Sequence, residues 1–568
     1  MTAPYRTSWI VALVAIVATL PACAEDRLRD LQESAIKTKN EKATRAYHFG
    51  SQGPNDVFSN HGSHTNRMVP VYVFGRKADL GSVTGSNSRY RTAEGVRSLY
   101  GVVPANTVNP EAEYADQSDL YKVQKDAVDR GAKHVFTVWF DGLDWDTTRA
   151  AAIVKAGKVA YSEGKGTGLV FQDYDASGTA QFGFVVTSPT HDRNVPDVDA
   201  QTVTIPANSM GGGYDPVIAG PTPWTPGLLL DRARGYLKGS SANDADKAGV
   251  ASVGRVLHAY TDSAPSAGEY ATGVKSYNNG INVADDGRFL PTLYNDLQKS
   301  GWKLGTVTSV PFDHASPAAL YAHNVHRDDY QDLGRDMLGL PSITQQDGKE
   351  GPHAGLDVVI GCGYGQVAKP QELTHQGKNV VPPGLYLADP DLAAVEAKNG
   401  GKYVVVHTEP SFDGSASVKA AASKAAADGK RLFGYFGSKT VNHLPYRTAD
   451  GDFRPVPGIG GRAESYTADD LKANPSLAAM TEAALTTLAA GKKPFALFVE
   501  AGDVDFALHD NNLDSAVGAV ISGDEAVRAI IAWVEKNSNW DDSALIVSAD
   551  HGHYLVIDKP EAIAGTAR

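Results

Sequence analysis

The segment TDSAPSAGEYATGVK, from Thr261 to Lys275, holds the residues whose types and spacing best fit a chemical role. Asp262 and Ser263 stand just ahead of an expected helix start. Backbone N–H groups at a helix N-terminus lack intrahelical partners and carry partial positive charge, so a serine oxygen there can attack an anion or carry one. Serine is also an ordinary helix N-cap, which is the alternative role. The anion that this arrangement favours is phosphate.

Four other segments place residues that can bind metals at the ends of expected strands. They are FDGLDWD from Phe140, FDHASPAALYAHNVHR from Phe312, VEAGDVDFALHD from Val499 and SADHGH from Ser548. Taken singly, each Asp could be a surface carboxylate and each His a core histidine bonded to backbone. Their recurrence after strand ends favours one shared, metal-dependent site.

Together with the serine segment, these motifs resemble the alkaline phosphatase family. Its members carry a strand ending in Asp-Gly, a Thr-Asp-Ser-Ala nucleophile segment and an Ala-Asp-His-x-His segment. The resemblance extends to GTGLVFQDY from Gly166, ATGVKSYNNGINV from Ala271 and LDVVIGCGYG from Leu356. It implies an enzyme that acts on small-molecule phosphate monoesters and releases inorganic phosphate through a phosphoserine intermediate, with Ser263 as the nucleophile.

The resemblance also implies two zinc sites and a third site, usually for magnesium. By matched position, the first zinc would take Asp505, His509 and His64; the second Asp141, Asp550 and His551, beside Ser263; the third Asp141, Ser316 and Glu500. Asp505 and His509 are four residues apart, so one helical turn would direct both to the same ion. His314 occupies the family's variable position near the third site, where its nitrogen would favour zinc or cobalt over magnesium. The identity of the third metal therefore stays open.

Arg327 closes the AHNVHR motif and matches the family's phosphate-binding arginine. Its planar fork can hold two phosphate oxygens at once, which lysine does less well; the alternative is a surface salt bridge. Asp262 is expected to orient Arg327 rather than to bind metal. Phe506 stands where better-known members have Lys or His, which would weaken a water-mediated phosphate contact. His553 matches no ligand position and is expected to support the ligands from behind.

The position of His64 indicates a circular permutation. In the family, the last zinc-binding histidine follows the Ala-Asp-His-x-His segment, whereas this chain reaches Arg568 soon after His553. A matching pattern, HTNRMVPVYVFG from His64, lies near the start of the chain instead. Chain termini in compact domains often lie close together at the surface, so such a move could preserve the site. The alternative is that His64 is one of several loop histidines, with His48 and His61 nearby.

Three other functions stay open. SAPSA from Ser263 resembles part of the sulfatase Cys/Ser-x-Pro-x-Arg signature, but Ala267 stands in the place of the Arg, so a sulfatase ranks below a phosphatase. Related two-zinc sites cleave phosphodiesters, often with a different nucleophile segment. A metal- or phosphate-binding protein without turnover would be expected to have lost site residues, and here every expected residue type is present if His64 is counted.

The elements that must position these residues form an alternating pattern. The apolar runs expected as strands are HVFTVWF from His134, KLGTVTSV from Lys303, KYVVVHT from Lys402, FALFVE from Phe495 and ALIVSA from Ala544. Helical stretches fall between them, for example Asp469 to Ala490 and Asp514 to Glu535. The pattern predicts an α/β fold with a doubly wound, mostly parallel central sheet and helices on both faces.

We divide the chain into a signal peptide at 1–24, an N-terminal helix and permuted His/strand segment at 25–80, and a catalytic domain at 81–568 with insertions around 155–245 and 341–465. The stretch from Ser162 to Ala242 is rich in Gly, Pro and Asp and is expected to form surface loops or a cap. The stretch from Glu25 to Tyr47 is charged and helix-prone. The loops around His353, His375 and His443 are candidates for shaping the site entrance or holding further ions.

The amino-acid composition limits the kinds of molecule that the protein is expected to bind. The chain has 568 residues, 42% hydrophobic and 21% charged, which fits a large globular enzyme. A formal net charge of −13 argues against binding to nucleic acid or to an anionic membrane. Members of the resembled family are commonly homodimers, so the resemblance alone implies a homodimer here.

The N-terminus predicts export. Arg6, an apolar run from Trp9 to Leu20 and the triplet ACA ending at Ala24 are typical of a secretory signal peptide, so we expect a secreted or periplasmic protein. LPAC, ending at Cys23, also resembles a lipoprotein box and would give a lipid-anchored enzyme. If Cys23 is removed or lipidated, Cys362 has no disulfide partner and is expected to be structural.

Overall fold

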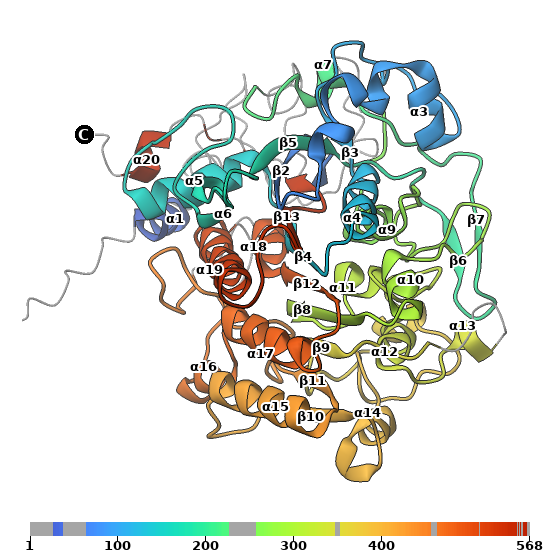
Figure 1. Ribbon diagram of the computed structural model, residues 1–568, viewed down its shortest axis with the longest axis vertical. Helices are drawn as coiled ribbons and strands as arrows, with labels where there is room; N and C mark the ends of the chain where they lie inside the picture. Colours follow the sequence, from blue (N-terminus) through green and yellow to red (C-terminus); the bar gives the residue numbers. More distant parts are fainter. Residues whose placement is uncertain are drawn as a thin grey trace, which may run out of the picture.

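The computed structural model describes residues 27–37, 64–225, 257–346, 353–455, 463–510, 512–553, 555, 557 and 560–564. The expected signal peptide and Cys23 lie outside these residues. The described part is built around a ten-stranded sheet with the order β10-β11-β9-β8-β12-β4-β13-β2-β5-β3 (Figure 1). Among the described helices, none combines the length and apolar character that crossing a membrane requires.

The strands of this sheet are mostly parallel. Their bounds are β10 (Tyr403–His407), β11 (Arg431–Tyr435), β9 (Val358–Cys362), β8 (Lys303–Pro311), β12 (Phe495–Ala501), β4 (His134–Phe140), β13 (Ser543–Ser548), β2 (Val69–Phe74), β5 (Gln181–Val186) and β3 (Ala115–Asp116). Neighbours from β10 to β13 run parallel, whereas β2 runs antiparallel to β13 and β5. Strands β12 and β13 are buried along their whole length, which explains their continuous apolar sequences.

Helices cover both faces of the sheet (Figure 1). One layer contains α5 (Trp145–Ala156), α15 (Gly414–Asp428), α17 (Leu477–Ala489) and α19 (Leu513–Asn537), and the other α4 (Asp119–Asp129), α9 (Ser263–Thr272), α10 (Leu293–Lys299) and α11 (Ala315–Ala319). The predicted doubly wound, mostly parallel α/β fold is therefore confirmed.

The remaining elements are smaller or peripheral. They are α1 (Arg27–Lys37), α3 (Ala93–Tyr100), α6 (Val170–Asp173), α7 (Pro216–Ala219), α12 (Tyr330–Leu338), α13 (Ile343–Gln346), α14 (Asp389–Val395), α16 (Ala468–Ala473), α18 (Asp503–His509), α20 (Pro560–Ala564), the pairs β1 (His64–Thr65) with β14 (Gly552–His553) and β6 (Val195–Asp197) with β7 (Thr202–Thr204), and the 3-10 helices η1 (Leu80–Ser82), η2 (Gly85–Asn87), η3 (Arg89–Arg91), η4 (Glu372–His375) and η5 (Ala397–Asn399).

Two expectations about the connecting segments need correction. The single helix expected over Asp469 to Ala490 is two helices, α16 and α17, because Pro475 lies between them and Ser476 caps the second by accepting from Ala479 N–H. The stretch from Ser162 to Ala242 contains more than surface loops, since β5 pairs with β2 inside the central sheet and buries Val185 and Val186. The segment 341–465 supplies β9, β10 and β11, of which β10 is the strand expected at KYVVVHT from Lys402.

Segments from the two ends of the chain lie side by side. The first described helix, α1, contacts α20, and Arg27 Nε donates a 2.8 Å hydrogen bond to the Ala562 carbonyl. Strand β2 pairs with β13, and β1 pairs with β14 in a register that sets His64 opposite His553. Of the helix-prone stretch from Glu25 to Tyr47, residues 27–37 are helical and the rest lies outside the described residues. This pairing brings His64 to the end of β13.

Candidate active site

The carboxyl ends of three adjacent strands supply the centre of the site. Asp141 directly follows β4, Glu500 lies near the end of β12, and Asp550 and His551 follow β13. Because β4 lies between β12 and β13 and all three are parallel, these ends meet at one edge of the sheet. All four side chains are buried.

Ser263 enters this centre from the helical layer. It is the first residue of α9, and Asp262 caps that helix by accepting a 2.7 Å hydrogen bond from Ala264 N–H. The Ser263 hydroxyl lies 3.4 Å from each carboxylate oxygen of Asp141. The sequence motif therefore gives a serine oxygen that faces the metal-binding residues from a positively polarised helix terminus.

His64, Asp505 and His509 form the first group of potential ligands. His64 Nε2 lies 3.0 Å from His509 Nε2 and 3.8 Å from Asp505 Oδ1, and His509 Nε2 lies 3.3 Å from Asp505 Oδ1. Ligands of a tetrahedral zinc ion stand about 3.4 Å apart, since each bond is about 2.0–2.1 Å long. The structure thus brings His64 to the two residues with which the permutation predicts it should lie.

His553 joins the same group. Its Nε2 lies 2.7 Å from Asp505 Oδ1, and its side chain is fully buried. Burial lowers the pKa of His553 to about 4, so the ring is neutral at neutral and alkaline pH. The sequence indicated a supporting position for this residue, whereas its donor atom lies among those of His64, Asp505 and His509, so that it could also hold a metal ion itself.

Asp141, Asp550 and His551 form the second group. His551 Nε2 lies 3.5 Å from Asp141 Oδ1, 3.3 Å from Asp550 Oδ2 and 3.9 Å from Asp505 Oδ1. The contact with Asp505 makes the two groups neighbours. Two cations bound in such neighbouring groups could act on one phosphate together.

The donor atoms of this centre fit divalent cations. Glu500 Oε1, Asp550 Oδ2 and His551 Nε2 are buried and have no hydrogen-bond partner among the described residues. Burial, with Asp550 and Asp505 nearby, raises the pKa of Asp141 well above its usual range. Packing so many carboxylates together in a buried site is unfavourable unless positive charge compensates them. Bound metal ions would supply that charge.

The residues of the predicted third site, Asp141, Ser316 and Glu500, lie close to one another, since Ser316 interacts with the Glu500 carboxylate and Glu500 helps to raise the pKa of Asp141. Glu500 Oε2 accepts a 2.5 Å hydrogen bond from Thr308 Oγ1, and burial raises the pKa of Glu500 to about 8. Ser316 is buried on α11. His314 Nε2 accepts a 3.1 Å hydrogen bond from Arg327, and its buried Nδ1 has no hydrogen-bond partner among the described residues. That His314 binds the third metal stays a prediction.

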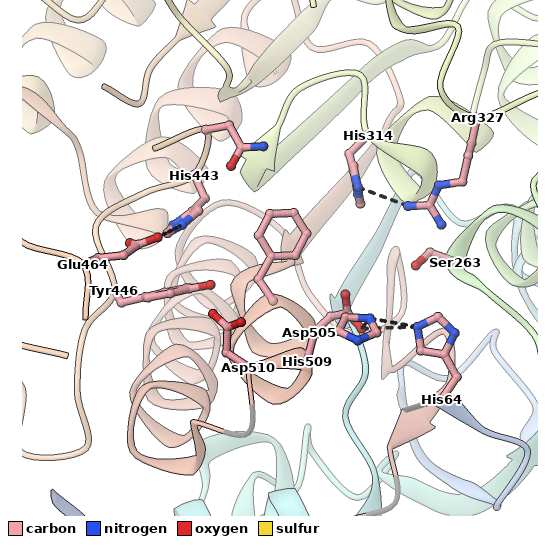
Figure 2. Close-up of a pocket in the computed structure, with 12 residues that line it drawn as sticks. His64, Ser263, His314, Arg327, His443, Tyr446, Glu464, Asp505, His509 and Asp510 are labelled. Carbon is pink, nitrogen blue, oxygen red and sulfur yellow. Dashed lines mark hydrogen bonds and ion pairs between the residues drawn. The ribbon is translucent and has the colours of Figure 1, made fainter. Parts of the chain in front are cut away.

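Arg327 is fixed between two partners. Its Nη1 donates to Asp262 Oδ1 at 3.1 Å, while Nη2 contacts His314. Asp262 is itself held by a 2.7 Å hydrogen bond from Asn279 N–H. Figure 2 shows the guanidinium directed toward Ser263. This arrangement matches the expectation that Asp262 orients Arg327.

A cavity of about 420 Å³ opens over these residues (Figure 2). Its lining residues are His64, Ser263, His314, Arg327, Asn442, His443, Tyr446, Glu464, Asp505, Phe506, His509 and Asp510. The sequence pointed to the loop around His443 only as a candidate for the entrance. Asn442, Tyr446 and Glu464 were not identified, because they lie in loops without a motif, and Asp510, the last residue of VEAGDVDFALHD, was given no role.

On the side of the cavity away from Ser263, polar side chains contact one another. His443 Nε2 lies 3.2 Å from Glu464 Oε1, and its ring stacks on Tyr446 with centroids 4.2 Å apart. The Phe506 ring lies between the two histidines, 5.4 Å from the centroid of His314 and 5.8 Å from that of His443. Phe506 therefore puts an apolar ring where the resemblance expects a polar side chain.

Cys362, at the end of β9, is buried, and burial raises the pKa of its thiol well above the usual range. A thiol in such surroundings is a poor nucleophile. This agrees with the expected structural role.

Comparisons of this chain with a family model and with known proteins agree on one family. The family model described as "Alkaline phosphatase" matches residues 240–566. The chain is 30% identical to alkaline phosphatase H of Pseudomonas aeruginosa over 316 residues, covering 54% of this chain and 60% of that protein. It is 28% identical to the alkaline phosphatase of Escherichia coli over 315 residues, with 54% and 60% covered. It is 27% identical to streptomycin-6-phosphate phosphatase of Streptomyces griseus over 310 residues, with 52% and 61% covered.

The chain thus spans about 60% of the length of these three relatives. Among solved structures, it is similar to the alkaline phosphatase of Thermus thermophilus, with 20% identity, a TM-score of 0.41 and coverage of 75% of this chain and 60% of the other. The cold-active enzyme of Shewanella sp. gives 18% identity and a TM-score of 0.40, with 74% and 68% covered. These scores are too low to establish a fold, which rests here on the sheet topology.

Proposed function

The chain belongs to the alkaline phosphatase family, and we propose that it is a metal-dependent phosphomonoesterase that releases inorganic phosphate through a phosphoserine at Ser263. The observation that carries the proposal is the position of the Ser263 hydroxyl, 3.4 Å from Asp141, at the start of α9. The same hydroxyl shares one cavity with Arg327 and with the histidine and carboxylate groups. A nucleophile, an anion-binding fork and a cation-binding centre are the parts that phosphoryl transfer needs.

The side chains divide the work of the reaction. Arg327, pre-oriented by Asp262, holds two phosphate oxygens, and the N-terminus of α9 adds positive potential behind the third. Two divalent cations bound to the groups around Asp505 and Asp141 would act as Lewis acids that lower the pKa of the attacking hydroxyl or water and stabilise the leaving oxygen. Ser263 attacks phosphorus, and the alcohol leaves. Water then cleaves the phosphoserine from the opposite side, which regenerates the serine and releases phosphate.

The proposal also names the metal ions and the residues that hold them. We propose that one zinc ion binds Asp505, His509 and His64. A second zinc ion would bind Asp141, Asp550 and His551. The third cation would be magnesium or another divalent metal. His64 would supply by permutation a ligand that relatives place after the Ala-Asp-His-x-His segment. The support is that His64 reaches Asp505 and His509 through the pairing of β1 with β14.

The cellular setting is proposed from the sequence. The charged and apolar pattern over residues 1–24 supports export, to the periplasm or beyond the cell, with Cys23 as a candidate lipid anchor. A homodimer is proposed from family membership. Protease protection and membrane fractionation of the full chain test the first proposal, and light scattering tests the second.

The decisive test of the nucleophile is the burst of phosphoserine formation. Ser263→Ala should abolish the burst and lower the turnover of a phosphomonoester by about 10³-fold or more, because the change removes the attacking hydroxyl. Ser266→Ala is the matched control: this serine lies in the same helix, and its Oγ donates only to backbone carbonyls at 3.2 Å. A full burst in Ser263→Ala would refute the assignment. Comparing rates on mono- and diesters distinguishes the phosphodiesterase alternative, and sulfate esters test the sulfatase one.

A further inference from the structure

A second group of side chains that could hold a metal ion includes the two residues that flank Arg327 in the sequence. His326 and Asp328 flank that arginine in the loop before α12, and His375 ends the 3-10 helix η4. One donor atom from each of the three residues lies within 4.8 Å of the others. None of the three belongs to the active-site groups described above, so this cluster has no part in the proposed reaction.

Both histidine rings of the cluster have a nitrogen near the same carboxylate oxygen. His375 Nδ1 lies 3.6 Å and His326 Nδ1 3.9 Å from the same oxygen, Asp328 Oδ2. The other oxygen, Oδ1, accepts a 3.1 Å hydrogen bond from Tyr330 Oη, which fixes the carboxylate so that Oδ2 faces both rings. The two rings stand nearly perpendicular, with centroids 4.8 Å apart. Separations of 3.6–3.9 Å need to close only slightly to match the spacing of about 3.4 Å around a tetrahedral zinc ion.

We infer that His326, Asp328 and His375 form a peripheral binding site for a borderline transition-metal cation such as zinc. Two imidazoles and one carboxylate are donors that suit zinc, cobalt or nickel, whereas magnesium and calcium prefer oxygen ligands. The side chain of His375 is 52% exposed and that of Asp328 38%, so water can reach the site and fill a fourth position. A cation there would replace the 3.1 Å contact between Asp328 N–H and His326 Nδ1.

The protonation of the ligands agrees with this geometry. Burial lowers the pKa of His326 to about 4, which leaves its lone pair free of a proton at neutral pH. Although burial opposes it, the charge of Arg327 holds the pKa of Asp328 below its usual range. The site would join the loop that carries Arg327 to η4, two segments far apart in the chain.

The test counts bound zinc in the full-length protein. Wild type, His375→Ala and His407→Ala are dialysed against one buffered zinc concentration, and zinc per chain is measured by mass spectrometry. His375→Ala should bind about one equivalent less than wild type, because two remaining ligands hold zinc weakly. His407, a part-buried histidine at the end of β10 that stacks on Tyr364, is the matched control and should bind as wild type does.

Repeating the measurement in a His64→Ala protein distinguishes zinc bound at this site from zinc bound in the active site. The double variant His64→Ala/His375→Ala should also bind about one equivalent less than His64→Ala, because the two sites share no ligand. Asp328→Asn should show the same deficit, since an amide does not neutralise the cation. Equal zinc content with and without His375 in both backgrounds would overturn the inference, whatever the enzyme's activity.

Discussion

The two walls of the active-site cavity are built on different principles. The inner wall, formed by His64, Ser263, Arg327, Asp505 and His509, comes from the short strand β1, the helices α9 and α18 and the loop before α12. The outer wall, formed by Asn442, His443, Tyr446, Glu464 and Asp510, comes largely from loops beyond β11 (Figure 2). Four of the five inner-wall residues therefore lie in helices or a strand, whereas the outer-wall residues lie outside helices and strands.

The charges of the two walls are also balanced differently. Behind the inner wall, Asp141, Glu500 and Asp550 crowd together with unpartnered oxygens on two of them. On the outer wall, His443 Nε2 lies 3.2 Å from Glu464 Oε1, and Tyr466 Oη donates a hydrogen bond to Glu464. The polar groups of the outer wall therefore find partners among themselves, whereas a buried centre of carboxylates needs positive charge from bound cations.

The largest effect should come from the centre behind the inner wall. Asp141→Asn removes a charge that faces both Ser263 and His551, so it should lower kcat/KM for a phosphomonoester by about 10³-fold and reduce bound metal. Steady-state rates and metal content measure this. Tyr446→Phe on the outer wall is the matched control, with an expected change of less than about threefold. Equal losses in both variants would show that the two walls do not differ in the way described.

A smaller effect is expected at Arg327, the residue of the inner wall that we propose binds phosphate. Arg327→Lys keeps the charge but loses the fork, so kcat/KM should fall by about 10- to 100-fold, and inorganic phosphate should inhibit less strongly. Inhibition constants for phosphate measure this directly. Arg76→Lys, at an exposed ion pair with Asp541, should leave both quantities unchanged. Wild-type phosphate inhibition in Arg327→Lys would remove the arginine from the phosphate site.

The smallest effect concerns stability on the outer wall. Although burial opposes it, the contact with Glu464 raises the pKa of His443, and the same contact lowers the pKa of Glu464. The stabilisation by the raised histidine is complete below its unfolded pKa of about 6.5 and is lost as pH rises through the folded value. The stabilisation by the lowered glutamate is present above about pH 4.3 and is lost as pH falls.

Glu464→Gln should therefore lower the free energy of unfolding by about 1 kcal/mol near pH 6 and by less near pH 9. Urea unfolding at the two pH values measures the difference. Glu482→Gln, which breaks a surface pair with Lys419, should show no such change between these values. A loss that is the same at both values would mean that the histidine contributes no charge to the pair.

The inner-wall centre could be predicted from the sequence, whereas the outer wall could not. Strands β4, β12 and β13 are continuous apolar runs, so their ends, and with them Asp141, Glu500 and Asp550, are predictable from the residue pattern alone. Strand β5 was missed because its residues QFGFVV lie in a Gly- and Pro-rich stretch that resembles loop. The orientation of His314 toward Arg327 depends on side-chain packing, which no motif encodes. The outer wall depends on loop conformation and was not predictable for the same reason.

The placement of His64 is the intermediate case. Its local pattern, a histidine followed by an apolar strand, identified it, but only the pairing of β1 with β14 brings it within 3.8 Å of Asp505. From the sequence alone, His64 could also be one of several loop histidines, with His48 and His61 nearby; those two residues lie outside the described residues. The proposed two-metal centre therefore depends on a residue from the opposite end of the chain.

The most direct measurement is phosphate release by metal-stripped protein resupplied with zinc and magnesium at alkaline pH, with zinc content measured on the same samples. Wild type, His64→Ala and the control His61→Ala are compared. We predict that His64→Ala loses about one zinc equivalent and at least about 100-fold in rate, because the ion loses one of its proposed ligands, while His61→Ala matches wild type. Full zinc content and full rate in His64→Ala would contradict the account of a site completed by His64.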